Sequence, residues 1–263
     1  MSPPADVLVA PRTRGLVTVT VNRARKHNAL SRPVLAALAQ AVAAAGRDAE
    51  TRCVLLRGAG NRYFAAGGDL VDLAEVKTKP ATRRMVDEAT AALDAIRACP
   101  LPVVAFVNGD ALGGGAELAV ACDLRIAASH ARLAYIHGRI GITSAWGGGT
   151  DLCELVGSAK AMRMMSRCEA VDAATALAWG LVDVIADDDA AIDAFIAPIV
   201  ALPPLVLRGI KAQTRAWKDG LPREARRSVE RDRLVETWLA SDHLEAVERF
   251  LAGRRRGASQ GQR

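Results

Sequence analysis

The feature that most constrains this chain is an apolar strand that passes through a glycine turn into an almost wholly apolar helix. Residues 103–107 read VVAFV, a short run typical of strands covered on both faces. Residues 108–123 continue as NGDALGGGAELAVACD, so the helix that begins near Gly114 has no polar face to turn toward solvent. We therefore expect this helix to lie at the centre of the fold.

Strand and helix patterns alternate on both sides of this segment. The alternating run LVTVTV predicts a strand over residues 16–21, and CVLLR predicts another over residues 53–57. Ala- and Leu-rich stretches predict helices over residues 31–45 and 81–98, the first of them capped by Ser31. This alternation indicates an α/β fold. Further strands are predicted at residues 124–127, 132–135 and 182–186.

Helical periodicity dominates the last part of the chain. We expect an α/β core over residues 1–190, a helical region over 191–252 and a disordered basic tail over 253–263. Removing the four tail arginines from the formal charge of +6 leaves +2 for the rest, so the basic balance mostly describes the tail. Nucleic-acid binding is therefore disfavoured, because no aromatic residues are interleaved with these arginines. They are Arg254, Arg255, Arg256 and Arg263.

Composition indicates an intracellular globular protein. Hydrophobic residues make up 51% of the chain and aromatic residues only 4%, which predicts a core of small aliphatic side chains. No apolar run is long enough for a signal peptide or a membrane span, so we expect a cytoplasmic protein. The cysteines have no metal-binding spacing and are expected to be buried, reduced thiols. They are Cys53, Cys99, Cys122, Cys153 and Cys168.

Two glycine-rich passages could bring bare backbone close to a ligand. One is FAAGGDL at residues 64–70, and the other is NGDALGGGAE at residues 108–117. The second lies at the positive end of the buried helix, where free N–H groups favour developing negative charge. The triple glycine could instead serve only a tight turn and close helix packing. A phosphate loop is disfavoured, because no GK[ST] or GxGxxG pattern fits either passage.

Together the two passages resemble the crotonase (enoyl-CoA hydratase/isomerase) superfamily. FAAGGDL is similar to the family's F-x-x-G-x-D loop, and residues 107–128 are similar to its G-x-x-x-G-G-G-x-E helix start. The resemblance continues through GITSAWGGGTDLCELVG and AWGLVDVI and covers about residues 8–250. It implies a ClpP/crotonase-like spiral of β-β-α units with a C-terminal helical region that closes the site and supports trimers or hexamers. It also implies an acyl-CoA substrate, with no metal or other cofactor.

The same resemblance assigns roles to individual residues. The backbone N–H groups of Gly68 and Gly114 would form an oxyanion hole for the thioester oxygen, where two preorganised donors stabilise an enolate. Glu117, one helical turn after Gly114, would be a catalytic carboxylate, or alternatively a structural one. Asp69 is expected to cap the helix that follows it. The substrate-binding loop would comprise Ala66, Gly67, Asp69 and Leu70.

The chain departs from the family pattern at two places. Hydratases of the family carry a second glutamate twenty residues after the first, and this chain has His137 there. Where a Pro-Gly-Ala-Gly-Gly-like loop is usual, residues 144–148 read SAWGG. This combination resembles the branch that contains ethylmalonyl- and methylmalonyl-CoA decarboxylases. In it, His137 could return a proton or only order its loop, and Trp146 could narrow the acyl pocket or only fill the core.

Three functions remain open from the sequence. Decarboxylation of an alkylmalonyl-CoA is slightly favoured over hydration or isomerisation of an enoyl-CoA. The third is a catalytically idle family member that binds RNA or a protein through its basic surface. In either enzyme, Arg25, Lys26 and His27 could meet the phosphates of CoA, or they could form an ordinary solvated loop.

Overall fold

The computed structural model describes residues 5–260, and it describes side chains for residues 5–252. The chain forms two compact units, of which the first ends at Ala201 and the second begins at Leu202. The expected boundary at residue 190 is therefore too early, because helix α7 (Asp189–Val200) belongs to the first unit. Within that unit Ile192 and Ile196 of α7 are buried, and Arg52 Nη1 donates to Val200 O at 2.9 Å.

The first unit contains a six-stranded and a four-stranded sheet. The strands are β1 (Val7–Val9), β2 (Leu16–Val21), β3 (Cys53–Gly58), β4 (Tyr63–Ala65), β5 (Val103–Val107), β6 (Asp110–Leu112), β7 (Leu124–Ala127), β8 (Arg132–Ala134), β9 (Ala170–Asp172) and β10 (Val184–Ile185). The helices of this unit are η1 (Ala24–Lys26), α1 (Arg32–Arg47), α2 (Lys79–Arg97), α3 (Gly114–Ala121), η2 (Ile136–Ile140), α4 (Gly148–Val156), α5 (Ser158–Arg167), α6 (Ala173–Trp179) and α7.

The chain winds as a spiral through the two sheets. The larger sheet has the order β1-β2-β3-β5-β7-β10, and the smaller has the order β4-β6-β8-β9. Each of the successive pairs β3–β4, β5–β6 and β7–β8 therefore gives one strand to each sheet before the next helix begins. All pairings are parallel except β1 with β2 and β8 with β9. The predicted α/β spiral of β-β-α units is confirmed.

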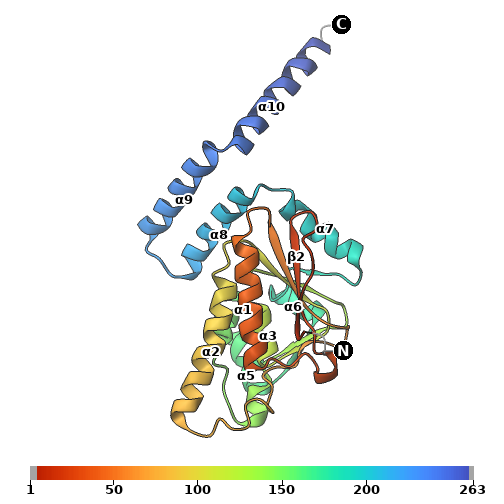
Figure 1. Ribbon diagram of the computed structural model, residues 1–263, viewed down its shortest axis with the longest axis vertical. Helices are drawn as coiled ribbons and strands as arrows, with labels where there is room; N and C mark the ends of the chain where they lie inside the picture. Colours follow the sequence, from red (N-terminus) through yellow and green to blue (C-terminus); the bar gives the residue numbers. More distant parts are fainter. Residues whose placement is uncertain (1–4, 261–263) are drawn as a thin grey trace. The chain divides into compact units, whose positions relative to one another are not determined.

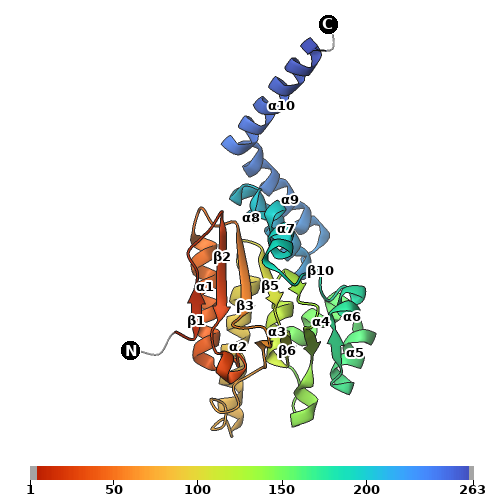
Figure 2. The ribbon, with the colours of Figure 1, turned by 90° about the vertical axis from the view of Figure 1, so that its right-hand side faces the viewer.

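Helices cover the large sheet and one helix lies inside the unit. Figures 1 and 2 show α1 and α2 side by side against the strands. The buried positions of α1 include Val34, Leu38 and Val42, whose spacing of four places them on one face of the helix. All eight residues of α3 are buried, as its apolar sequence predicts. The glycine turn before α3 is thus held at the centre of the fold.

The predicted strands agree closely with the structure, and the predicted helix cap does not. The strands expected at 103–107 and 124–127 are β5 and β7, whereas β1, β4, β6 and β9 were not predicted. Each of these four is only three residues long, too short to show a period. Ser31 is the residue before α1 but its side chain makes no cap hydrogen bond. The Asp72 carboxylate takes that place, accepting from Arg32 N at 3.0 Å.

The second unit is wholly helical within the described residues. It contains α8 (Pro204–Lys218), α9 (Arg223–Trp238) and α10 (Ser241–Gln260). α8 packs on α9, since a Cβ built on Gly209 would lie 3.5 Å from Cβ of Arg233. α10 continues through residues 253–260, and the disorder predicted from Gly253 stays a prediction there. The prediction for 261–263 lies outside the described residues.

Among the described residues the cysteines form no disulfide, and most of them are buried. Four of them are buried and Cys153 is half-buried. Burial raises the pKa of the Cys53 thiol to about 12, so this group stays protonated at neutral pH. No single helix in residues 5–260 has both the length and the apolar composition to cross a membrane, although α7 and α8 joined as a bent pair satisfy these two criteria.

Candidate active site

The two glycine-rich passages lie against one another. A Cβ built on Gly67 would be 3.5 Å from Gly114 N, and Gly67 has a positive φ of 107° that side chains rarely adopt. Any side chain on Gly115 would overlap the backbone oxygen of Ala65. The loop after β4 and the start of α3 can therefore touch only because both are glycine. The structure therefore confirms that these glycines permit close packing, the alternative role considered for them from the sequence.

The backbone N–H groups of Gly68 and Gly114 are free to donate. The neighbours of Gly68 are occupied: Ala66 N donates to His27 O at 3.0 Å, and Asp69 N donates to Leu30 O at 3.1 Å. Within residues 5–260, neither the Gly68 nor the Gly114 N–H has a protein acceptor. Two unpaired donors from touching loops fit the expected oxyanion hole, whose role stays a prediction.

Trp146 lies beside both of these glycines. Its Cη2 atom would be 2.6 Å from a Cβ built on Gly114 and 3.6 Å from one built on Gly68. The Trp146 residue is only 8% exposed, so the indole ring is enclosed. The structure therefore brings Gly68, Gly114 and Trp146 together, although they are far apart in the sequence.

Glu117 is buried in α3 and uses both carboxylate oxygens. Its Oε1 accepts hydrogen bonds from Trp146 N at 2.9 Å and from Gly148 N at 3.3 Å. Its Oε2 lies 3.1 Å from His137 Nε2. The residue is 1% exposed, and a buried carboxylate requires such partners. One oxygen thus holds the 144–148 loop, while the other faces a residue that can exchange a proton.

His137 lies on η2, at the N-terminal end of α3. A Cβ built on Gly113 would be 3.7 Å from His137 Nε2, so the imidazole lies close to the residue that precedes Gly114. Because an ionised carboxylate only accepts hydrogen bonds, Nε2 carries the hydrogen when it is paired with Glu117. The His137 side chain is 13% exposed, which leaves it partly accessible. The pair is a charge-assisted acid–base couple whenever His137 is protonated.

Tyr135 also holds the 144–148 loop, through its hydroxyl group. Its hydroxyl donates to Gly148 O at 2.7 Å, and the residue is 1% exposed. Burial raises the pKa of Tyr135, and the negative charge of Glu117 raises it further. The hydroxyl therefore remains a donor at neutral pH. The sequence marks Tyr135 only weakly, because the contact depends on a turn thirteen residues later.

Asp69 organises a turn, and the helix expected after it does not form. Its Oδ1 accepts from Val71 N at 3.1 Å and from Asp72 N at 3.4 Å, and the residues that follow are turns. Its Oδ2 pairs with Arg23 Nη2 at 2.8 Å. Burial raises the pKa of Asp69, but Arg23 and the two backbone donors lower it more, and the net pKa is lowered. Arg23 was missed because it reads as one more charge in a basic loop.

The basic loop at residues 25–27 lies next to the glycine loop. Arg25, Lys26 and His27 are exposed at the end of η1, and the His27 ring stacks on Tyr63 with centroids 4.6 Å apart. The backbone bond from Ala66 N to His27 O joins this loop to the glycine loop. Leu70 is 61% exposed in the same region. These positions are compatible with CoA binding, which stays a prediction.

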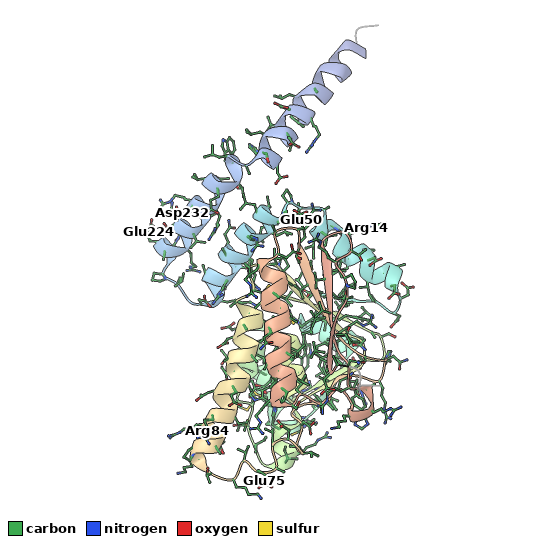
Figure 3. All side chains as sticks on the ribbon, in the orientation of Figure 1. Arg14, Glu50, Glu75, Arg84, Glu224 and Asp232 are labelled. Atoms are coloured by element: carbon green, nitrogen blue, oxygen red, sulfur yellow. The ribbon has the colours of Figure 1, made fainter. Side chains whose placement is uncertain are left out.

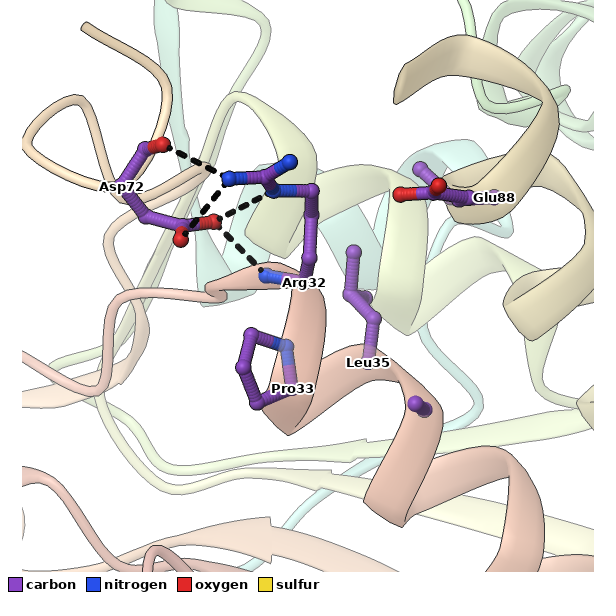
Figure 4. A pocket seen from close by; sticks show the side chains of 7 residues that line it. Arg32, Pro33, Leu35, Asp72 and Glu88 are labelled. Atoms are coloured by element: carbon purple, nitrogen blue, oxygen red, sulfur yellow. Dashed lines mark hydrogen bonds and ion pairs between the residues drawn. The ribbon is translucent and has the colours of Figure 1, made fainter. Parts of the chain in front are cut away.

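A surface pocket of about 450 Å³ lies between α1 and α2, away from the Glu117–His137 pair. Figure 4 shows the residues that line it. Arg32 is hydrogen-bonded to Asp72, and Glu88 lies on the facing helix α2. None of the residues predicted for catalysis or substrate binding lines it. The Arg32–Asp72 contact at this pocket connects the turn after Asp69 to the start of α1. Among the described residues, no cluster of three or more His, Cys, Asp or Glu could hold a metal ion.

Comparison with known proteins identifies the family. The Enoyl-CoA hydratase/isomerase family model matches residues 12–257. The chain is 30% identical over 251 residues to ethylmalonyl-CoA decarboxylase of Mus musculus, covering 93% of this chain and 77% of that protein. It is 30% identical over 237 residues to a probable enoyl-CoA hydratase of Bacillus subtilis (strain 168), covering 87% and 89%.

The fold agrees with that assignment. The crystal structure of enoyl-CoA hydratase from Bacillus anthracis superimposes with a TM-score of 0.87, at 28% identity, over 95% of this chain and 97% of that one. The range that the family model matches, residues 12–257, contains both glycine passages, Glu117 and His137. The chain belongs to the enoyl-CoA hydratase/isomerase family and has the crotonase fold.

Proposed function

We propose that this protein is a lyase that decarboxylates a short-chain alkylmalonyl-CoA. The observation that carries the proposal is the hydrogen bond between Glu117 Oε2 and His137 Nε2, close to Gly113 in the glycine turn before α3. A histidine replaces the second carboxylate at this position, so the site holds one carboxylate and one proton donor. That set suits the return of a proton to an enolate better than the addition of water by two carboxylates.

The first step would be loss of CO₂ from the α-carboxylate. The electron pair of the broken C–C bond moves into the thioester and places negative charge on its oxygen. The Gly68 and Gly114 amides are the available donors for that oxygen, and removal of one such donor in other enzymes costs about 3–4 kcal/mol. Backbone donors on packed glycines are already oriented before the charge develops. No cofactor is required for this step.

The second step would be protonation of the enolate carbon. The Nε2 proton of the His137 imidazolium, which Glu117 Oε2 holds at rest, would leave that carboxylate and pass to the enolate carbon, and the partly exposed ring would then recover a proton from solvent. Glu117 stabilises the imidazolium as a carboxylate partner, and its other oxygen stays fixed by Trp146 N and Gly148 N. The products are CO₂ and the saturated acyl-CoA. The net reaction consumes one proton.

Trp146 would restrict the acyl group. Its ring is enclosed between Gly68 and Gly114, so the space near the proposed oxyanion hole is narrow. A short branched acyl chain fits this restriction better than a long one. The mouse relative named ethylmalonyl-CoA decarboxylase supports the same substrate class.

Hydration of a 2-enoyl-CoA is the second candidate. It is favoured by the solved Bacillus anthracis relative, whose title names an enoyl-CoA hydratase, and by the Bacillus subtilis relative of similar name. In that reaction Glu117 and His137 together would activate and deliver water. The basic loop at residues 25–27 would hold CoA phosphates in both reactions, and we propose a homotrimer or hexamer in the cytoplasm.

Parallel assays separate the candidates. Purified protein is supplied with ethylmalonyl-CoA and methylmalonyl-CoA, and CO₂ release is measured; crotonyl-CoA is supplied separately, and loss of enoyl absorbance is measured. The proposal expects rapid CO₂ release and slow hydration, with His137→Asn lowering the first activity by about 10²-fold or more. Rapid hydration of crotonyl-CoA with no CO₂ release would establish the hydratase instead. Inactivity on every thioester, with RNA binding that falls steeply with salt, would favour the idle binding protein.

A further inference from the structure

Three consecutive peptide units connect Ala145 to Gly148, and the outer two hold Glu117. The N–H of Trp146 belongs to the first unit and the N–H of Gly148 to the third, and both donate to Glu117 Oε1. Because each peptide unit is planar and stiff, the direction of the middle unit sets how the outer two face one another. The orientation of the middle unit therefore determines whether both N–H groups can point at Glu117 Oε1.

Gly147 O accepts from the backbone of α4, and the other three carbonyls from Ala145 to Gly148 each accept from a side chain. Thr90 Oγ1 donates to Ala145 O at 3.2 Å, and Tyr135 Oη donates to Gly148 O at 2.7 Å. The carbonyl of the middle unit, Trp146 O, accepts from Arg97 Nη2 at 3.0 Å. Arg97 is thus the side chain that fixes the unit between the two amides on Glu117.

Arg97 is itself held rigidly. It is the last residue of α2, and its Nε and Nη2 lie 3.0 and 2.7 Å from Asp151 Oδ2 at the start of α4. Its Nη1 lies 2.8 Å from Asp94 Oδ1. Burial lowers the pKa of Arg97, but the two carboxylates raise it more, so the guanidinium stays charged. The planar fork can bind a carboxylate and a carbonyl at once, which a lysine cannot reproduce.

The guanidinium also lies directly on Gly147. A Cβ built on Gly147 would be 2.9 Å from Arg97 Nη2, and Gly147 has a positive φ of 86°. The residue at this position must be glycine for both reasons. Arg97, Gly147 and Asp151 therefore fix the orientation of the middle peptide unit. None of the three is among the residues proposed to contact substrate.

We infer that Arg97 is a positioning residue that orients Glu117 and Trp146 through the middle peptide unit. Without it, the Trp146–Gly147 unit is free to rotate, the two amides no longer converge on Glu117 Oε1, and the Trp146 ring leaves the two glycines. The effect on catalysis rests on the proposed function, whereas the effect on Trp146 does not. The experiment therefore has one arm for each.

The kinetic arm compares Arg97→Ala, Arg97→Lys and a control, Arg84→Ala. Arg84 projects from the exposed side of the same helix (Figure 3). Arg97→Ala is expected to lower kcat by about 10²-fold while KM for the CoA thioester changes by less than about threefold, since misplacement of a catalytic group by about 1 Å has this effect. Arg97→Lys keeps the charge and is expected to recover part of kcat. Arg84→Ala should match the parent.

The second arm follows Trp146 without substrate. In a protein carrying Trp179→Phe, Trp217→Phe and Trp238→Phe, Trp146 is the remaining tryptophan and its fluorescence should resist acrylamide quenching. Adding Arg97→Ala should increase quenching and shift emission to longer wavelength, with circular dichroism unchanged. If Arg97→Ala does not fold, Arg97→Lys decides by the same two measurements.

The outcomes are separable. Parental kcat together with parental quenching in the Arg97 variants overturns the positioning role. Equal losses of kcat in Arg97→Ala and Arg84→Ala would also overturn it, because they would show only a general effect on α2. If the parent turns over no acyl-CoA, the proposed function fails, and the quenching arm still decides the role of Arg97.

Discussion

Replacing Glu117 by glutamine should nearly abolish turnover while leaving the fold intact. A glutamine oxygen can still accept from Trp146 N and Gly148 N, which lie 2.9 and 3.3 Å from Glu117 Oε1. The amide nitrogen would then face His137 Nε2, 3.1 Å from the present carboxylate oxygen. The substitution therefore removes the negative charge that stabilises an imidazolium at His137, and little else.

The size of the effect follows from that lost charge. We expect kcat to fall by about 10²–10⁴, the range for loss of general acid–base catalysis. This corresponds to about 2.7–5.4 kcal/mol of activation free energy, at about 1.36 kcal/mol for each factor of ten. The free energy of unfolding should change far less, because Trp146 N and Gly148 N keep an acceptor and neutral His137 can accept from the glutamine amide at Nε2 with its proton on Nδ1.

Alanine at the same position gives the contrasting result. Glu117→Ala leaves the N–H groups of Trp146 and Gly148 buried without their acceptor, and each such orphaned donor costs about 1–3 kcal/mol. The free energy of unfolding should therefore fall by about 2–6 kcal/mol for the two donors together. Urea unfolding of the parent, Glu117→Gln and Glu117→Ala measures this quantity.

Steady-state kinetics and unfolding together test the reasoning. A loss of kcat below tenfold in a folded Glu117→Gln protein would refute a catalytic carboxylate and leave Glu117 a structural residue. Equal stability of the alanine and glutamine variants would refute the claim that Glu117 holds the 144–148 loop.

Further predictions concern the glycine passages and the acid limit of stability. Gly114→Ala should lower kcat at least tenfold because its Cβ would overlap the Trp146 ring, and adding Trp146→Ala should restore part of kcat, which kinetics of the double variant will show. Trp146→Ala alone should raise kcat/KM for longer acyl chains relative to short ones, measured over a substrate series; an unchanged ratio would remove Trp146 from specificity. The lowered pKa of Asp69 contributes stability that is complete above its ordinary value of 3.8 and is lost as pH falls through the lowered folded value. Melting temperatures between about pH 5 and pH 2.5 should therefore fall less steeply for Asp69→Asn than for the parent, and parallel curves would contradict the Arg23–Asp69 contribution.

Local pattern was enough for the central elements of this fold. β2 is an alternating run of valine and threonine and β5 is a continuous apolar run, so local pattern alone identifies them; β7 has one charged residue, Arg125, among apolar ones. α3 could be placed at the centre because its sequence has no polar face. The two glycine passages were expected to face a ligand, which stays a prediction, and the resemblance that they carry predicted the family correctly. The resemblance to the family also marked Glu117 and His137, whose catalytic roles stay predictions.

Sequence pattern did not show what these residues contact. Glu117 accepts from Trp146 and Gly148, which are 29 and 31 positions away, and such pairings follow from the path of the spiral. Arg97 and Asp151 are separated by 54 positions and read as ordinary surface charges until the fold joins them. Asp69 was predicted to cap a helix, but its carboxylate instead pairs with Arg23 and accepts a hydrogen bond from the backbone of a turn.

The difference has one physical cause. Periodicity and turn chemistry act between residues a few positions apart, so they determine strands, helices and glycine turns from the sequence by itself. Burial of a charge, by contrast, is tolerated only where partners converge from several elements, and only the tertiary structure decides which partners arrive. The elements were thus determined locally, whereas the surroundings of Glu117, Trp146 and Arg97 were determined by the packing of the whole first unit.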